Sequence, residues 1–163
     1  MNQEHTYKHV LVALDINDDF QPLLQRAITI ARRHNAKLSV LHVDINLRDL
    51  YTEMVDIDVE TVQRKVLADT KGKLDTILAG VDYPLERSMV MCGDLVEEVN
   101  QVVEAQNVDL LVCGHHQSFW NLLASAARQL MNTVSCDLLI IPFSAKKIAY
   151  RFTVDPDSDS PFL

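Results

Sequence analysis

The sequence predicts an α/β fold: a single domain with an open parallel five-stranded sheet and helices on both faces, as in flavodoxin-like and Rossmann-like proteins. Five short apolar runs recur along the chain, and apolar residues between them repeat with a period near 3.6. Strands and helices that alternate at these lengths are typical of right-handed β–α–β crossovers, which build a parallel sheet. The 163 residues are enough for one domain with a good-sized core.

The five apolar runs are the predicted strands, and they cover residues 9–15, 37–43, 85–91, 109–113 and 137–142. The first is almost continuous in Val, Leu and Ala, which suits a strand that is covered on both faces. The third is interrupted by Glu86, Arg87 and Ser88, so we expect it to be an edge strand with one side in water. Pro142 ends the fifth, because proline has no N–H to donate to a neighbouring strand.

Four apolar stripes predict the helices, and we expect each stripe to lie on the sheet as part of the core. Asp94 follows Gly93 at the start of the third helix, where an acid in the first turn is favourable. The stripes are Leu23, Leu24, Ala27, Ile28 and Ala31; Val59, Val62, Val66, Leu74, Ile77 and Leu78; Leu95, Val96, Val99, Val102 and Val103; and Phe119, Leu122, Leu123, Ala126, Leu130 and Val134.

Two segments fall outside this alternation. Residues 44–57 form a long connection after the second strand, and such a connection either carries function or serves partner contact and packing. Residues 144–163 follow the last strand and end in DPDSDSPFL, a composition that indicates an acidic, partly disordered tail. Within that tail, residues 148–154 are candidates for a short strand or for packing on a partner. We therefore predict an α/β domain at 1–143 and a C-terminal extension at 144–163.

Composition and charge exclude several classes of function. The formal net charge of −8 repels a phosphate backbone, so nucleic acid is not an expected partner. No apolar run approaches the roughly 20 residues that span a bilayer. The N-terminus lacks the apolar stretch of a signal peptide. We therefore expect a cytoplasmic protein that does not bind a membrane. The three cysteines show no CxxC spacing and are expected to be small buried thiols that stay reduced.

Ligands of an open parallel sheet bind beyond the carboxyl ends of the strands. If the first and fourth strands are neighbours, Asp15 faces the loop at 114–117 across such a crevice. Its carboxylate could accept a hydrogen bond from a ribose hydroxyl or hold a metal. Alternatively Asp15, Asn17 or Asp18 caps the first helix.

The remaining polar and aromatic side chains near this loop each have two interpretations. His115 and His116 could bind metal, but no third ligand stands at a recognisable spacing, so bracing hydrogen bonds or a pH-sensitive contact are the alternatives. His42 is expected to be a core histidine with satisfied hydrogen bonds. Phe119 and Trp120 either stack on a base or seal the helix onto the sheet.

Nothing in the sequence demands catalysis. Ser118 and Ser125 have histidines nearby, but the chain has no nucleophile elbow of the G-x-S-x-G type. Cys113 precedes Gly114 inside a predicted strand and is expected to be buried. We therefore predict neither catalytic residues nor a metal site.

Several short motifs together resemble the universal stress protein family, in its branch typified by universal stress protein A. They are VLVALD in the first strand, HVD at the end of the second, Gly93-Asp94, and DLLVCGHH, continuing as GHHQSFW. The resemblance runs from about Lys8 to Phe143. It implies the strand order 3-2-1-4-5, a role in stress response, and a homodimer through the last strand, with other universal stress proteins as further candidate partners.

The nucleotide-binding members of this family carry G-x2-G-x9-G-[ST] after the fourth strand. Here only the first glycine is kept, and the other three positions are Gln117, Ala127 and Arg128. Glycines let the backbone approach phosphates closely, and Gln117 disfavours that geometry. We therefore predict no tight ATP binding, while AMP or an anion could still occupy the site. The candidate site residues are Ala13, Asp15, Val43, Gly114, His115, Gln117, Ala127 and Arg128.

The predicted function is that of a non-catalytic, dimeric interaction module for the stress response. The apolar fifth strand motivates the dimer, because an unpaired apolar edge is a template for pairing. Its predicted interface residues are Leu138, Leu139, Ile140, Ile141 and Pro142. The alternative is an adenine-nucleotide sensor or slow ATPase that uses Asp15, Gly114 and Arg128, and a third candidate is a flavodoxin-like domain for another small molecule.

Overall fold

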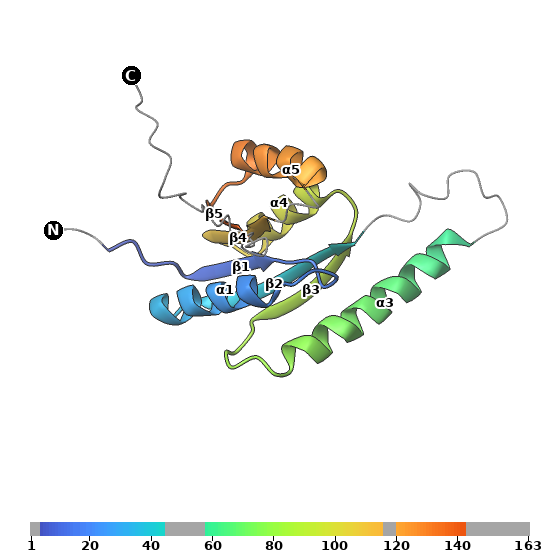
Figure 1. The fold of residues 1–163 in the computed structure, drawn as a ribbon, viewed down its shortest axis with the longest axis horizontal. Helices are drawn as coiled ribbons and strands as arrows, with labels where there is room; N and C mark the ends of the chain where they lie inside the picture. Colours follow the sequence, from blue (N-terminus) through green and yellow to red (C-terminus); the bar gives the residue numbers. More distant parts are fainter. Residues whose placement is uncertain (1–3, 45–57, 116–119, 143–163) are drawn as a thin grey trace, which may run out of the picture.

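A computed structural model describes residues 4–44, 58–115 and 120–142 of the chain. Strands and helices alternate along it (Figure 1). In chain order they are β1 (His9–Ala13), α1 (Gln21–His34), β2 (Lys37–Asp44), α3 (Val59–Leu78), β3 (Arg87–Cys92), α4 (Leu95–Ala105), β4 (Leu110–His115), α5 (Trp120–Thr133) and β5 (Asp137–Pro142).

The strands form one parallel sheet in the order β3-β2-β1-β4-β5, which confirms the predicted fold class and strand order. β3 lies at one edge, as its interrupted apolar run predicted, and β5 lies at the other. The register sets Ala13 of β1 beside Leu41 of β2 and Cys113 of β4. The ends of β1, β2 and β4 therefore meet at one edge of the sheet.

The helices divide between the two faces of the sheet, as predicted. α1 and α3 pack on the face that carries Val10, Val12 and Val40, while α4 and α5 cover the face that carries Leu11 and Leu111 (Figure 1). Successive side chains of β1 point to opposite faces of the sheet, and Val10, Leu11 and Val12 are all fully buried. This is why its sequence is continuously apolar rather than alternating.

The helix boundaries follow local signals. α1 ends at His34 because Asn35 takes the left-handed conformation, with φ 52°, and Arg32 and Arg33 stand in its last turn. α4 begins after Asp94, whose carboxylate accepts a hydrogen bond from the backbone N–H of Glu97 at 3.0 Å. Asp94 is thus the N-cap residue rather than the first-turn acid that we expected.

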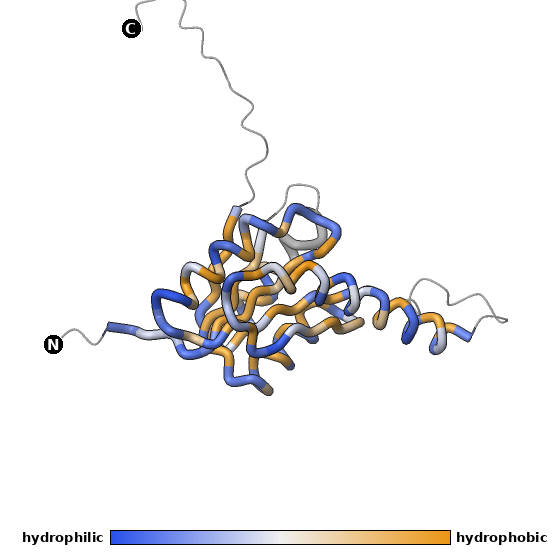
Figure 2. Tube along the Cα trace, turned by 90° about the horizontal axis from the view of Figure 1, so that it is seen from below, coloured by the Kyte–Doolittle hydropathy of each residue, from blue (hydrophilic) through white to orange (hydrophobic). Residues whose placement is uncertain are grey.

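The predicted apolar stripe of α3 is wrong over the first half of the helix. Leu74 and Leu78 are buried, but Val62 is 42% exposed, and Val59 and Val66 are only partly buried. The hydroxyl of Thr70 donates to the Asp44 carboxylate at the end of β2 (3.3 Å), so earlier turns extend past the carboxyl edge of the sheet. Figures 1 and 2 show this part of α3 projecting from the body of the molecule.

The strand boundaries shift by a few residues from the prediction. β1 ends at Ala13, so Asp15 lies in the following turn, and β4 continues through Gly114 to His115. β5 has the predicted bounds. The connection at 45–57, the loop at 116–119 and the extension from 143 lie outside the described residues.

Candidate functional site

The carboxyl edge of the sheet brings part of the predicted site together. β1 and β4 are neighbours, as the crevice hypothesis requires. Ala13 ends β1 and Val43 lies near the end of β2, and both are partly buried. Gly114 is the penultimate residue of β4, where it pairs with Ile141 of β5. It therefore belongs to the sheet itself rather than to the loop that follows.

Asp15 braces the turn after β1 instead of capping α1. Its Oδ1 accepts hydrogen bonds from the backbone N–H of Asn17 at 2.9 Å and from the side-chain amide of Asn17 at 3.0 Å. The residue before α1 is Phe20, and no side chain caps the helix. The capping prediction for Asp15, Asn17 and Asp18 was therefore wrong, and the carboxylate stays partly exposed at the crevice.

His42 is buried beneath this turn, but only one of its nitrogens is satisfied. Nδ1 lies 3.1 Å from the carbonyl oxygen of Leu14, and it must donate because a carbonyl can only accept. Nε2 is buried and has no hydrogen-bond partner among the described residues. Asp15 Oδ1 lies 3.9 Å from Nδ1. His42 thus links β2 to the turn that carries Asp15. The expectation that both of its ring nitrogens would be hydrogen-bonded is wrong.

Carboxylates stand at the ends of three neighbouring strands. Asp15 follows β1, Asp44 ends β2, and Asp94 comes two residues after the last residue of β3. Charges of one sign at a single edge of the sheet repel an anionic ligand. This edge of the sheet therefore carries three carboxylates among its described residues.

The remaining predicted site residues fall on β4, the loop and α5. His115 ends β4, but its side chain and Gln117 lie outside the described part of the structure. Ala127 is partly buried, and Arg128 is exposed. Arg128 is eight residues beyond the start of α5, roughly 12 Å along the helix axis. The two residues are therefore positioned by the helix and not by the loop.

A groove beside this edge was missed by sequence reasoning. It has a volume of about 450 Å³ and lies between the turn after β1 and the middle of α3. Its lining is mixed: Ile16, Ile77 and Gly72 with the polar Asn17, Lys73 and Thr76. No sequence signal marked this groove: Gly72 lies in the interior of a helix, but a Cβ there would meet nothing within 4 Å, so no close approach requires a glycine.

Cys113 and Cys136 are held in unreactive environments, whereas Ser118 and the surroundings of the Ser125 side chain lie outside the described part of the structure. Burial raises the pKa of the Cys113 thiol to about 12, and it also raises the pKa of Cys136. These thiols are therefore protonated near neutral pH, and a thiol is a poor nucleophile. All three cysteines are free, and they are partly rather than fully buried.

A Ser–His pair does occur, but it lies inside the core. His9 Nδ1 donates to the carbonyl oxygen of Gln106 at 2.9 Å, and Nε2 lies 2.8 Å from the hydroxyl of Ser39. Both residues are buried, and Ser39 is fully inaccessible to solvent. The pair therefore joins β1, β2 and the end of α4, and it cannot reach a substrate.

The described residues contain neither a metal-binding cluster nor a membrane-spanning helix. In the ranges 4–44, 58–115 and 120–142, no three His, Cys, Asp or Glu side chains gather as they would around a metal ion. No helix within those ranges has the length and apolarity needed to cross a bilayer.

Comparison with known proteins identifies the family. The universal stress protein family matches residues 6–142, most of the chain. This chain belongs to the universal stress protein family. The universal stress protein A homolog of Haemophilus influenzae is 43% identical over 136 residues, which cover 83% of this chain and 96% of that protein.

Solved structures of universal stress proteins share the fold at lower identity. Universal stress protein UspA from Lactobacillus plantarum aligns with a TM-score of 0.60 and 19% identity, over 84% of this chain and 99% of that one. A universal stress protein family protein from Arabidopsis thaliana with AMP bound aligns with a TM-score of 0.55 and 16% identity, over 88% and 97%. The family resemblance drawn from the VLVALD and GHHQSFW motifs is therefore confirmed.

Proposed function

We propose that this universal stress protein acts in the cytoplasm as a homodimer, without catalysis and without tight ATP binding, through surfaces that it presents to other proteins. The observation that carries the proposal is the replacement of three of the four nucleotide-motif positions by Gln117, Ala127 and Arg128. The carboxylates at the same edge of the sheet add to this argument, because they repel phosphates.

The edge strand β5 supports the dimer. Its outer edge has no neighbouring strand in the described sheet, and Ile140 in its middle is 36% exposed. An apolar edge strand with unpaired N–H and C=O groups is a template for pairing with another chain. A two-fold axis across β5 would pair the two edges and cover Leu138–Pro142 in each protomer.

Three candidate nucleophiles among the described residues stand in unreactive environments, and this supports a non-catalytic role. Ser39 is inaccessible in the core, and the thiols of Cys113 and Cys136 have raised pKa values. Relatives are named as universal stress proteins rather than as enzymes. Function would then depend on which surfaces the dimer exposes.

The motif hypothesis is tested by restoring the motif. The variant Gln117→Gly/Ala127→Gly/Arg128→Ser rebuilds all four positions, and we expect it to bind ATP at least tenfold more tightly than wild type, because bare backbone can then approach the phosphates. Isothermal titration calorimetry measures both proteins. The control Gln129→Gly/Met131→Gly makes glycines at exposed neighbouring positions of α5 and should not gain affinity.

The second candidate function is an adenine-nucleotide sensor. It is supported by the AMP bound in the Arabidopsis relative and by the pairing of β4 with β1, the strand that Asp15 follows. A monophosphate needs fewer phosphate contacts than ATP, so the lost glycines matter less. Titration with AMP separates the two candidates. Micromolar AMP binding by wild type would favour the sensor over a protein that acts only by binding other proteins.

A further inference from the structure

The groove between α3 and the turn after β1 has the size of a site for a small molecule. Its volume is about 450 Å³, within the range of roughly 300–1,000 Å³ that is usual for such sites. α1 packs mainly on β1, β2 and β4, whereas α3 packs mainly on β3, so the two helices of this face stand over different strands (Figure 1). Ile16 and Asn17, in the turn that joins β1 to α1, fill only part of the space beside α3.

Two isoleucines form the apolar walls of this groove. Ile16 and Ile77 are partly buried and pack against the core, so the core fixes their positions while part of each side chain still meets solvent. Gly72 has no side chain, and a Cβ there would meet nothing within 4 Å. The groove is therefore open at Gly72, and an apolar ligand that enters it removes the surface of both isoleucines from water.

Lys73 brings a positive charge that no carboxylate of the described residues neutralises. Its side chain is exposed, and it forms no ion pair with any residue that the structure describes. Asp69 stands four residues before Lys73 on the same helix but is not paired with it. Asp75 is bound instead by Lys71 and Ser88. None of the six lining residues is acidic, so this cation is left for an anionic ligand.

Asn17 adds a neutral donor to the same lining. Its side-chain amide has two N–H groups, and Asp15 Oδ1 accepts from this amide nitrogen at 3.0 Å. One amide N–H is therefore left for a ligand. The hydroxyl of Thr76 is already used, because it donates to the carbonyl oxygen of Gly72 at 2.9 Å. One ammonium group and one amide N–H suit a carboxylate, which carries a single charge and only accepts hydrogen bonds.

We propose that this groove binds a small amphipathic carboxylate, with its charged end on Lys73 and Asn17 and its apolar body against Ile16 and Ile77. The site goes beyond the proposed function. It belongs to α3 and the turn after β1, whereas the proposed dimer uses β5, at the edge of the sheet opposite β3. Binding in the groove therefore requires neither the dimer nor an empty nucleotide crevice.

Titration of the ¹⁵N-labelled full chain with 4-phenylbutyrate tests this site by NMR. We expect saturable shifts of backbone amides centred on residues 16, 17, 72, 73, 76 and 77, with a dissociation constant of about 1 mM or below. The neutral 4-phenylbutyramide lacks the charge, and inorganic phosphate lacks the apolar body. Each should therefore bind at least about fivefold more weakly than 4-phenylbutyrate.

Two variants remove the two parts of the site. Lys73→Met should raise the dissociation constant about fivefold or more, whereas Lys65→Met, at another exposed position of α3, should leave it unchanged. Gly72→Leu places a side chain in the open space of the groove and improves helix propensity, so we expect a folded protein that no longer binds the probe. The control Gly80→Leu adds the same side chain in open space beyond the end of α3 and should bind like wild type.

Several results would overturn the site. They are undiminished binding by Gly72→Leu, equal binding of the carboxylate and its amide, and amide shifts that lie elsewhere on the molecule. The absence of saturable shifts at about 20 mM probe would also do so. The proposed dimer is measured separately by sedimentation, and none of these results bears on it.

Discussion

At the scale of single residues, two buried histidines on neighbouring strands show how polar groups are placed in this core. His9 has both nitrogens bonded, to Gln106 and Ser39. In His42, Nδ1 is bonded to the carbonyl oxygen of Leu14, whereas Nε2 is buried without a partner among the described residues. A buried polar atom that loses its partner costs free energy, because water no longer compensates it. His9 is therefore the more sensitive position to probe.

We expect Ser39→Ala to lower the free energy of unfolding by about 1–3 kcal/mol, because it leaves His9 Nε2 buried and unpaired. Urea denaturation followed by circular dichroism measures the change. The control Thr76→Ala removes a hydroxyl that bonds only to the carbonyl of Gly72 in its own helix, and it should stay within about 0.5 kcal/mol. Equal effects of the two substitutions would show that the Ser39–His9 bond is not stabilising.

A second residue-scale prediction concerns pH. Lys71, followed by Ser88, holds the pKa of Asp75 below its usual value of 3.8. A carboxylate with a lowered folded-state pKa stabilises the fold above its unfolded pKa, and this stabilisation is lost as the pH falls through the folded value. Asp75→Asn should therefore flatten the fall of stability below about pH 5.

The measurement is the free energy of unfolding in urea at steps between pH 6 and the acid limit of folding. Lys71→Met removes the principal partner of Asp75 and should flatten the curve in the same way. Identical slopes for wild type and both variants would rule out this ion pair as a source of acid sensitivity.

At the scale of elements, two glycines have opposite roles. Gly93, between β3 and α4, has φ 151°, and a Cβ there would lie 2.8 Å from Glu98 Oε1. Gly72 lies in the interior of α3, and a Cβ there would meet nothing within 4 Å. The first glycine is required by the turn, whereas the second only adds freedom to the unfolded chain.

We expect Gly93→Ala to destabilise the protein by about 1–3 kcal/mol, since alanine rarely adopts that conformation. Gly72→Ala should instead stabilise it by about 0.5–1 kcal/mol through helix propensity. Thermal unfolding of both variants gives the two signs directly. Loss of stability in Gly72→Ala would mean that the groove beside α3 needs its open backbone.

The sequence predicted the elements well where periodicity and burial agree. The stripe from Leu23 to Ala31 and the stripe from Val96 to Val103 are buried as expected. It failed at Val62, because helical periodicity does not reveal where the sheet beneath a helix ends. It also failed at Asp15, because one side chain can cap a helix or brace a turn, and only the backbone path decides between them.

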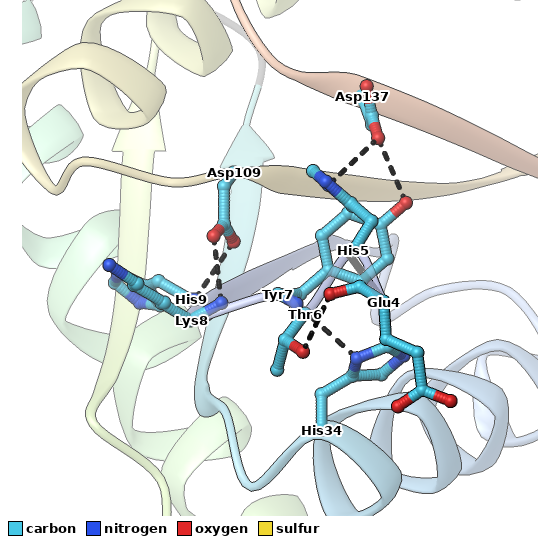
Figure 3. A network of polar contacts seen from close by, with 9 residues as sticks. All are labelled: Glu4, His5, Thr6, Tyr7, Lys8, His9, His34, Asp109 and Asp137. Atoms are coloured by element: carbon cyan, nitrogen blue, oxygen red, sulfur yellow. Dashed lines mark hydrogen bonds and ion pairs between the residues drawn. The ribbon is translucent and has the colours of Figure 1, made fainter. Parts of the chain in front are cut away.

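At the scale of the whole molecule, the two edges of the sheet differ in character. The carboxyl edge carries Asp15, Asp44 and Asp94 around the family's nucleotide position. The amino edge is closed by the network of Tyr7, His34 and Asp109, next to the open strand β5 (Figure 3). We propose that the carboxylates at the first edge disfavour phosphates and that β5 serves as the surface for assembly.

The site could be only partly predicted from the sequence. The strand ends predicted that β1 and β4 are neighbours and that Ala13, Val43 and Gly114 lie near one edge of the sheet, because parallel strands place their carboxyl ends together. The groove beside Gly72 and the unpaired Nε2 of His42 depend on contacts between distant segments, which no local pattern records. The occupancy of the crevice stays a prediction.

Native mass spectrometry of the purified protein tests the central claim most directly, because one spectrum reports both assembly and bound ligands. We predict a species with the mass of two 18.5 kDa chains and nothing added. The same species with one ATP or ADP per protomer, released on denaturation, would contradict the account.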